Sequence, residues 1–184
     1  MFLSSRNNQF KFEFPRKFIP DNVNKKYKPF INKMSGGMIS EPIDLWNHGI
    51  QSMNIPGPSF TPGEQKDYPG FTRKFRTPDP TQELFNKELT ITMKSLSGFI
   101  NYWMAIDTFD AYYAKSGKEP WVIEGPGVQF MDVEGNLFVT AHLKEMIFTG
   151  VSELSLNFSS NTVEFDTFDL TFSYNILEID VNLN

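Results

Sequence analysis

The chain of 184 residues contains no cysteine and only two histidines, His48 and His142. The lack of cysteine excludes disulfide frameworks, Cys-ligated zinc, iron–sulfur clusters and thiol nucleophiles. No stretch of the sequence approaches the roughly 18 consecutive apolar residues of a membrane span. Residues 1–14 carry charges throughout instead of an apolar signal segment. We therefore expect a protein without a metal, a cofactor, a membrane span or a secretory signal.

Recognisable catalytic motifs are equally scarce. Gly36-Gly37 is not followed by the Gly-Lys-Ser/Thr ending of a phosphate loop, and no Gly-x-Ser-x-Gly elbow is present. The segment 132–136 has turn composition and lacks the spacing of a calcium loop. Because a Ser-His-Asp set can assemble from distant residues, an enzyme of unrecognised type stays an open alternative. The prediction is nevertheless that the protein is not an enzyme.

Aromatic residues are abundant, with 19 Phe, 6 Tyr and 3 Trp. Disordered chains are poor in aromatics, so this composition predicts a folded protein with a sizeable core. At the usual size of about 150 residues per domain, the length predicts one domain over residues 1–184.

Charge is divided unequally along the chain. Residues 1–80 carry 12 Lys and Arg against 7 Asp and Glu, whereas residues 81–184 carry 5 against 15. Such asymmetry is compatible with chance on a solvated surface, but it also allows the basic part of one copy to meet the acidic part of another.

The first 80 residues are rich in proline, which removes backbone donors and disfavours a central sheet. We expect extended loops here, with short strands at 10–14 and 49–55 and one arm of a hairpin at 71–76. A connection as long as 56–80 is rare in compact domains unless it is functional or becomes ordered on a partner. The run Arg73-Lys74-Arg76 between phenylalanines would suit nucleic-acid binding, but an exposed hairpin tip explains it more simply. The candidate inter-subunit contacts are Phe10, Phe12, Phe14, Phe60, Phe71, Arg73, Lys74, Phe75 and Arg76.

The pattern becomes regular after residue 80. Alternating apolar residues predict strands at 84–94, 127–133, 137–149, 153–158 and 168–176. Apolar residues spaced by three and four predict one amphipathic helix over 97–114, which buries Trp103 and Tyr113. The fold class expected is therefore α+β and mostly β: an antiparallel sandwich or barrel of two packed sheets, with one flanking helix and long extended N-terminal loops.

The regular core, residues 84–176, resembles the tail tube proteins of long-tailed bacteriophages, especially those of the contractile type. The likeness rests on a strand leading into an aromatic helix, a strand with a Gly-x-Ser turn, and a closing aromatic strand. The segments concerned are FNKELTIT (85–92), GFINYW (98–103), LKEMIFTGVS (143–152) and FDTFDLTFSY (165–174).

The resemblance implies a structural virion protein. Its copies would form hexameric rings that stack into the inner tail tube, a conduit for DNA ejection that binds DNA without specificity. The partners implied are further copies, the tail sheath, and baseplate or terminator proteins. The place implied is the virion tail, assembled in the host cytoplasm. An acidic lumen would repel phosphates, and the candidate lumen-facing residues are Glu153, Asp166 and Asp169.

Two alternatives stay open beside a main tube subunit. One is a specialised relative, such as a tube initiator or baseplate tube component. The other is a non-enzymatic β-sandwich binding module, for example one that binds carbohydrate on a platform of Trp46, Trp103 and Trp121.

Overall fold

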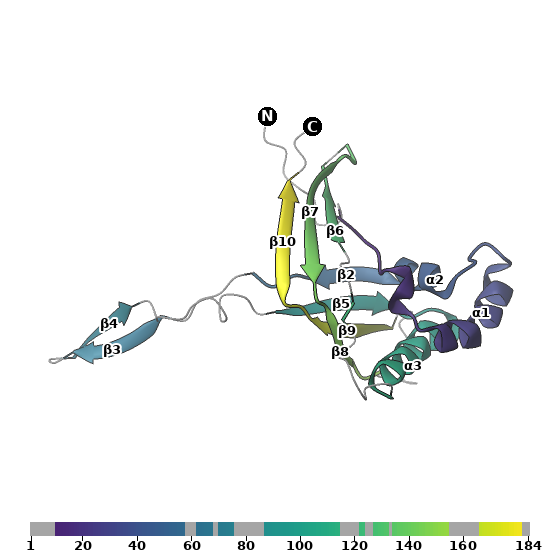
Figure 1. Ribbon diagram of the computed structural model, residues 1–184, viewed down its shortest axis with the longest axis horizontal. Helices are drawn as coiled ribbons and strands as arrows, with labels where there is room; N and C mark the ends of the chain where they lie inside the picture. The colour runs from purple at the N-terminus through teal and green to yellow at the C-terminus, as the bar shows by residue number, and fades with distance from the viewer. Residues whose placement is uncertain are drawn as a thin grey trace, which may run out of the picture.

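The computed structural model contains two four-stranded antiparallel sheets, three α-helices and a separate two-stranded hairpin (Figure 1). It describes residues 10–57, 62–67, 70–75, 87–114, 122–123, 127–132, 134–154 and 166–181. Sheet A has the strand order β1-β6-β7-β10, and sheet B has the order β2-β5-β9-β8. The strands are β1 (Phe10–Phe12), β2 (Ile50–Asn54), β3 (Gly63–Asp67), β4 (Phe71–Phe75), β5 (Glu88–Lys94), β6 (Gly127–Met131), β7 (Leu137–Lys144), β8 (Ile147–Val151), β9 (Thr167–Ser173) and β10 (Ile176–Val181).

The centre of sheet B follows directly from sequence alternation. Strands β5 and β9 pair antiparallel along their whole length, and every second residue of each is buried. The buried residues are Leu89, Ile91, Met93, Phe168, Leu170 and Phe172. Because side chains alternate between the two faces of a strand, the remaining polar residues form the opposite face. The predicted mostly-β fold with two antiparallel sheets is confirmed.

Two strands that the sequence suggests are continuous are in fact broken where the chain changes sheet. The predicted strand 137–149 divides into β7 of sheet A and β8 of sheet B, with Glu145 between them at a φ of 54°. The predicted strand 168–176 ends at Ser173, and the chain returns to sheet A as β10. Asn175 joins the two crossings, because its backbone N–H donates to the Lys144 carbonyl and its side chain donates to Glu145. A strand that turns a corner between packed sheets must bend in this way.

The prediction of an irregular N-terminal region was wrong for two helices. Helix α1 (Asp21–Ser35) follows Pro20 and ends at Gly36, whose φ of 61° is the left-handed conformation favoured at helix ends. Helix α2 (Pro42–His48) begins with a proline, whose missing N–H costs nothing at that position. Proline therefore marks helix starts in this region, not only loops.

The third helix, α3 (Ile100–Ala114), lies within the predicted range but buries a different face. A short 3₁₀ turn, Ser97–Phe99, precedes it. Trp103 is 54% exposed, and Tyr113 is also exposed, contrary to the prediction. The buried face instead carries smaller and polar side chains, including Asn101 and Thr108. Apolar and polar residues occur on both the buried and the exposed side of the helix, so spacing alone could not identify its buried face.

One cluster of buried aromatic rings joins the segment around Phe18 to the helices and to the sheets. Phe18, in the 3₁₀ turn Arg16–Phe18, is 1% exposed. Its ring lies 5.3 Å from that of Trp46, 5.8 Å from that of Phe148 and 6.0 Å from that of Phe172, measured between centroids. The N-terminal residues therefore form part of the core, not an arm outside it.

Hydrogen bonds between side chains also hold α1 against α3. We call the group of Lys26, Tyr27 and Asp107 the helix clamp. The Asp107 carboxylate accepts hydrogen bonds from the Lys26 ammonium and, at 2.6 Å, from the Tyr27 hydroxyl. Partial burial opposes the charged form of Asp107, but the bonds from Lys26 and Tyr27 outweigh it and lower the pKa of the carboxyl. Burial, reinforced by the bond to Asp107, raises the pKa of the Tyr27 phenol, so the phenol stays a donor.

We predict that Phe18→Ala lowers the free energy of unfolding by about 3–5 kcal/mol, because it opens a cavity among buried rings. Phe30→Ala serves as the matched control, since Phe30 is exposed on α1 and should change stability by less than about 0.5 kcal/mol. Urea unfolding followed by tryptophan fluorescence measures both. Equal effects of the two substitutions would show that the N-terminal turn is not part of the core.

We further predict that Asp107→Asn lowers stability at pH 7 by about 1 kcal/mol. The folded pKa of Asp107 is lowered, so its stabilising effect is present above the unfolded pKa of about 3.9 and is lost as pH falls through the folded pKa. The difference between wild type and variant should therefore shrink below about pH 4. Asp110→Asn, at an exposed position of the same helix, is the control for thermal unfolding between pH 3 and 8.

Candidate functional site

One face of sheet B is a polar wall. Its central strands present only polar side chains on this face, and Thr90 lies opposite Thr171 while Thr92 lies opposite Asp169. The full set in these two strands is Glu88, Thr90, Thr92, Lys94, Thr167, Asp169, Thr171 and Ser173. Hydroxyl groups and charged side chains therefore dominate the middle of this face.

The three predicted lumen residues lie near the same end of sheet B, and of the three Asp169 is one of the wall residues. Ser152, next to Glu153, accepts a hydrogen bond from the Asp169 backbone N–H at 2.8 Å, and its own N–H donates to the Asp169 carbonyl at 2.9 Å. Asp166 immediately precedes β9, and its carbonyl accepts from the Ser95 N–H at 2.8 Å. Glu153 and Asp166 are exposed, and Asp169 is half-buried. These three residues are acidic. That they face a lumen stays a prediction.

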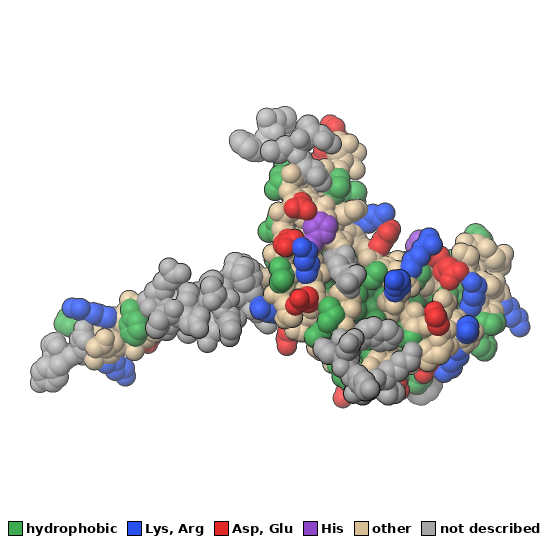
Figure 2. All heavy atoms as spheres, in the orientation of Figure 1, with side chains coloured by type: hydrophobic (Ala, Val, Ile, Leu, Met, Phe, Trp, Pro, Cys, Tyr) green, Lys and Arg blue, Asp and Glu red, His purple; other side chains and the backbone are tan. Residues whose placement is uncertain are grey.

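The hairpin of β3 and β4 stands apart from the two sheets (Figure 1). Its register places Phe71, Arg73 and Phe75 on one face and Thr72 and Lys74 on the other. Every residue of β4 is exposed, and Phe71 is 72% exposed. Figure 2 shows Lys and Arg side chains on this projecting element. The predicted hairpin arm is confirmed, and its contact role stays a prediction; Phe60 and Arg76 lie outside the described residues.

The three phenylalanines of the N-terminal segment have different places. Phe12 and Phe14 are buried in the core of their own chain, and the Phe14 N–H donates to the Asn47 side chain at 2.9 Å. Their rings are therefore not accessible to a neighbouring copy, and we do not carry them forward as contact residues. Phe10 is only half-buried and remains accessible.

One ion pair and one histidine–carboxylate contact join β7 and β10 on the outer face of sheet A. Lys144 pairs with Glu178, and His142 lies 3.2 Å from Asp180, measured from Nε2 to the carboxylate oxygen. A groove of about 420 Å³ crosses this face toward Lys11 and Arg16. The charges in it are mixed, so the groove is not selective for an ion of either sign.

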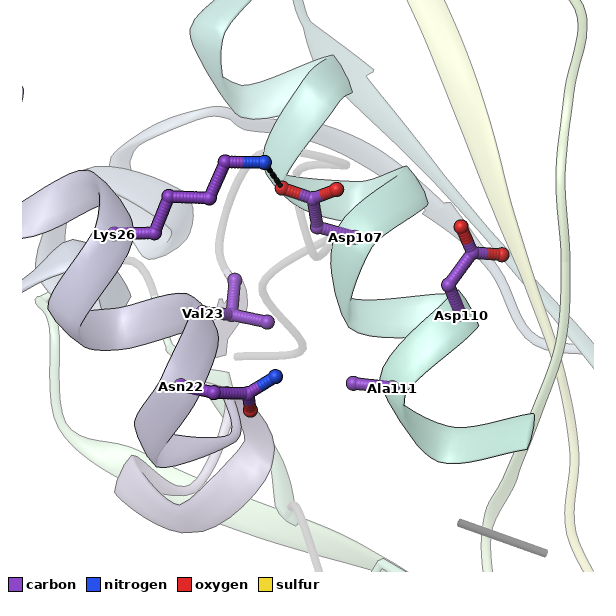
Figure 3. Close-up of a pocket in the computed structure, with 6 residues that line it drawn as sticks. All are labelled: Asn22, Val23, Lys26, Asp107, Asp110 and Ala111. Atoms are coloured by element: carbon purple, nitrogen blue, oxygen red, sulfur yellow. Dashed lines mark hydrogen bonds and ion pairs between the residues drawn. The ribbon is translucent and has the colours of Figure 1, made fainter. Parts of the chain in front are cut away.

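A small recess of about 300 Å³ lies between α1 and α3 (Figure 3). Asn22 and Val23 face Ala111 across it, Lys26 reaches over to Asp107, and Asp110 points away from the gap. The Asp107 carboxylate is already used in the helix clamp, so the recess has no free acid and base aimed at a common point. It does not have the geometry of a catalytic site.

The described residues also contain no group of three or more His, Cys, Asp or Glu side chains that could hold a metal ion. None of the helices in the same described ranges is long and apolar enough to cross a membrane.

The sequence analysis missed two features that the structure brings together. The helix clamp joins Lys26 and Tyr27 to Asp107, about 80 residues away in sequence. The other feature is an uncovered apolar end of sheet A, which includes Ile179 and Val181. The alternation of apolar and acidic residues over 177–181 signals this second feature, but pairing with β7 is needed to see it.

No protein-family model matches the chain, and a search of curated proteins finds no match. Among solved structures, the chain is similar to one titled as the tube-terminating cap of the anti-feeding prophage, with a TM-score of 0.50 and 12% identity over 99% of this chain and 94% of that one. It also matches a chain from the baseplate of the anti-feeding prophage, with a TM-score of 0.49 and 9% identity over 72% and 80%. A third match is a sheath-tube complex of an extracellular contractile injection system, with a TM-score of 0.43 and 14% identity over 72% and 81%. At such low identity, the likeness to the cap protein concerns the fold.

Proposed function

We propose that the chain is a structural subunit of the inner tube of a contractile tail or injection system, and not an enzyme. Its copies close into hexameric rings, and the rings stack into a hollow conduit through which DNA passes. The observation that carries this proposal is the shared fold with a tube-terminating cap protein over 99% of the chain. The phage-like segments in residues 84–176 support it independently, because they come from the sequence alone.

Open sheet edges provide a physical route to ring closure. Sheet A ends in β1 and β10, and sheet B ends in β2 and β8. Unpaired edges offer backbone donors and acceptors to another chain, and a closed ring satisfies them. Contacts between different surfaces of identical copies close into a ring when the rotation allows it and extend into a filament along the axis.

The polar wall of sheet B is our candidate for the lumen. Threonine hydroxyls form its middle, and at one end the carboxylates of Glu153, Asp166 and Asp169 outnumber the one wall cation there, Lys94, which pairs with Thr167. A wall of negative potential repels phosphates, so DNA slides along it instead of binding. Sheath, baseplate and terminator proteins would then contact the outer surface and the ends of the tube.

A specialised tube component is the second candidate. The likeness to a cap protein over nearly the whole chain favours an end component as well as a main subunit. The two roles differ in polymerisation, because a main subunit stacks without limit whereas an end component forms a single ring that binds a tube end.

The carbohydrate-binding alternative is not supported by the tryptophans. Trp46 is fully buried among aromatic rings, so it contributes nothing to a sugar platform. Trp103 is exposed on α3, and Trp121 lies outside the described residues. A platform on which a sugar stacks needs accessible aromatic faces, and only one of these three tryptophans is shown to supply one.

We predict that the purified protein forms rings and hollow tubes of uniform width at high concentration, visible by negative-stain electron microscopy. Deleting residues 56–80 should leave the thermal unfolding midpoint of the dissociated subunit within a few degrees, because within the described residues β3 and β4 pair only with each other. The same deletion should abolish stacking. Wild-type protein that stays monomeric at every concentration, even with tube ends added, would contradict the tube role.

A charge reversal at the candidate lumen tests the conduit. We predict that Glu153→Lys, Asp166→Lys and Asp169→Lys together convert tubes that do not retain a short DNA duplex into tubes that do, measured by co-sedimentation at low and high salt. Asp110→Lys changes an exposed charge on α3 and is the control. Equal DNA retention by the control tubes would show that these three residues do not define the lumen.

A further inference from the structure

Sheet A carries a regular apolar face. The paired positions form rows that cross all four strands, with one residue from each strand. The first row contains Phe10, Phe130, Val139 and Val181, and the second contains Phe12, Val128, Ala141 and Ile179. All eight residues are apolar, as expected of a face that packs against another layer.

Sheet B covers only part of this face. In the second row Phe12, Val128 and Ala141 are buried, whereas Ile179 on the edge strand is 63% exposed. In the first row Phe130 and Val181 are exposed, and Phe10 and Val139 are half-buried. Figure 1 shows β6, β7 and β10 rising past sheet B toward the chain termini. We name the first row together with Ile179 the apolar row; among the described residues nothing covers it fully.

The β3–β4 hairpin also exposes an apolar face. A two-stranded hairpin by itself has marginal stability in water and needs a third strand or another element to pack against. One of its faces carries Phe71 and Phe75, with Gln65 paired to Arg73 between them. Both phenylalanines are exposed, and in its own chain the hairpin lies away from the two sheets (Figure 1).

The two surfaces also match in size and charge. Phe71 and Phe75 are about 13 Å apart at about 3.3 Å per residue, and four strands of sheet A span about 14 Å at about 4.8 Å per gap. Two acidic residues, Asp132 and Glu134, lie in the turn beside the apolar row, whereas Asp180 lies on the other face of sheet A with His142. Asp132 accepts hydrogen bonds from Glu134 and Asn136, which fixes its carboxylate in this turn. The docking face of the hairpin carries one cation, Arg73, and one carboxylate, Asp67 opposite Phe71, whereas Lys66 and Lys74 lie on its other face.

We propose that the β3–β4 hairpin of one copy docks, by its Phe71–Arg73–Phe75 face, on the apolar row of the next copy. The proposal rests on the self-assembly proposed above and names its contact. The phenylalanines bury the exposed part of the row, and Arg73 on the same face meets the acidic turn at Asp132 and Glu134. Because donor and acceptor are different surfaces, each copy gives one hairpin and receives one, which is the arrangement that extends an assembly.

Cross-linking between full-length copies tests the docking, and the absence of cysteine makes the labelling specific. A tagged Gln65→Cys copy is mixed with an untagged Ile179→Cys copy and treated with a short bismaleimide. Thr72→Cys, on the opposite hairpin face, replaces Gln65→Cys in the control. We expect the tagged–untagged product to exceed the control by at least tenfold. Equal yields from the two faces, or a product only within a chain that carries both cysteines, would overturn the docking.

Complementation supplies a second measurement. The Phe71→Ser/Phe75→Ser variant loses the donor surface, and the Ile179→Asp/Val181→Asp variant loses the acceptor surface. All four positions are exposed, so unfolding midpoints should stay near that of the dissociated wild type. Each variant alone should sediment no further than a single ring, and an equimolar mixture of the two should pair two rings and grow no further. Self-association of either variant at the wild-type level would refute the contact.

The outcomes separate this contact from the tube role. If tubes form and both hairpin faces cross-link equally, the docking is wrong and the tube role stands. If cross-linking is selective for one face but only open oligomers form, the docking stands and the tube role is wrong.

Discussion

The burial of Phe18 among aromatic rings is the interaction on which the rest of the subunit depends. Its ring contacts those of Trp46, Phe148 and Phe172, which come from α2, β8 and β9. The contact therefore ties the N-terminal segment to the helices and to sheet B. Aromatic rings contribute both a large buried area and preferred geometries, so one cluster of them can orient several elements at once. The helices then need few further bonds, of which the Asp107 clamp is the most evident.

The corner at Glu145 and Asn175 has a different role, because it sets how the two sheets meet. Two crossings between the sheets lie there, β7 to β8 and β9 to β10, and the side chain of Asn175 on one bonds to Glu145 on the other. Lys144 is the last residue of β7 in sheet A, and Glu145, which follows it, forms the bend. The crossing fixes β7 and β10 side by side in sheet A, where they extend past sheet B.

Sequence reasoning predicted the elements whose periodicity is unambiguous. Strand β5, the hairpin of β6 and β7, and the buried face of β9 all agree with alternation. It failed where one residue type is compatible with two structures, since proline is typical of loops but also begins α2 at Pro42. It also failed on α3, whose exposed Trp103 looks like a core residue by spacing alone. The acidic cluster at Glu153, Asp166 and Asp169 was predicted as a set, but its location at the end of sheet B depends on pairing that no local pattern reveals.

The two exposed apolar surfaces carry the strongest argument that the isolated chain is an incomplete unit. A folded monomer seldom leaves an ordered apolar row and an unsupported hairpin on the same molecule, since each exposes apolar surface to water. In the proposed docking, one contact between two copies covers the hairpin of one copy and the apolar row of the other. The buried core around Phe18 is the main interaction that holds the subunit together, whereas the hairpin and, apart from Phe10, the apolar row lie outside it. The chain can therefore fold first and assemble afterwards, a sequence of events that suits a subunit added repeatedly to a growing structure.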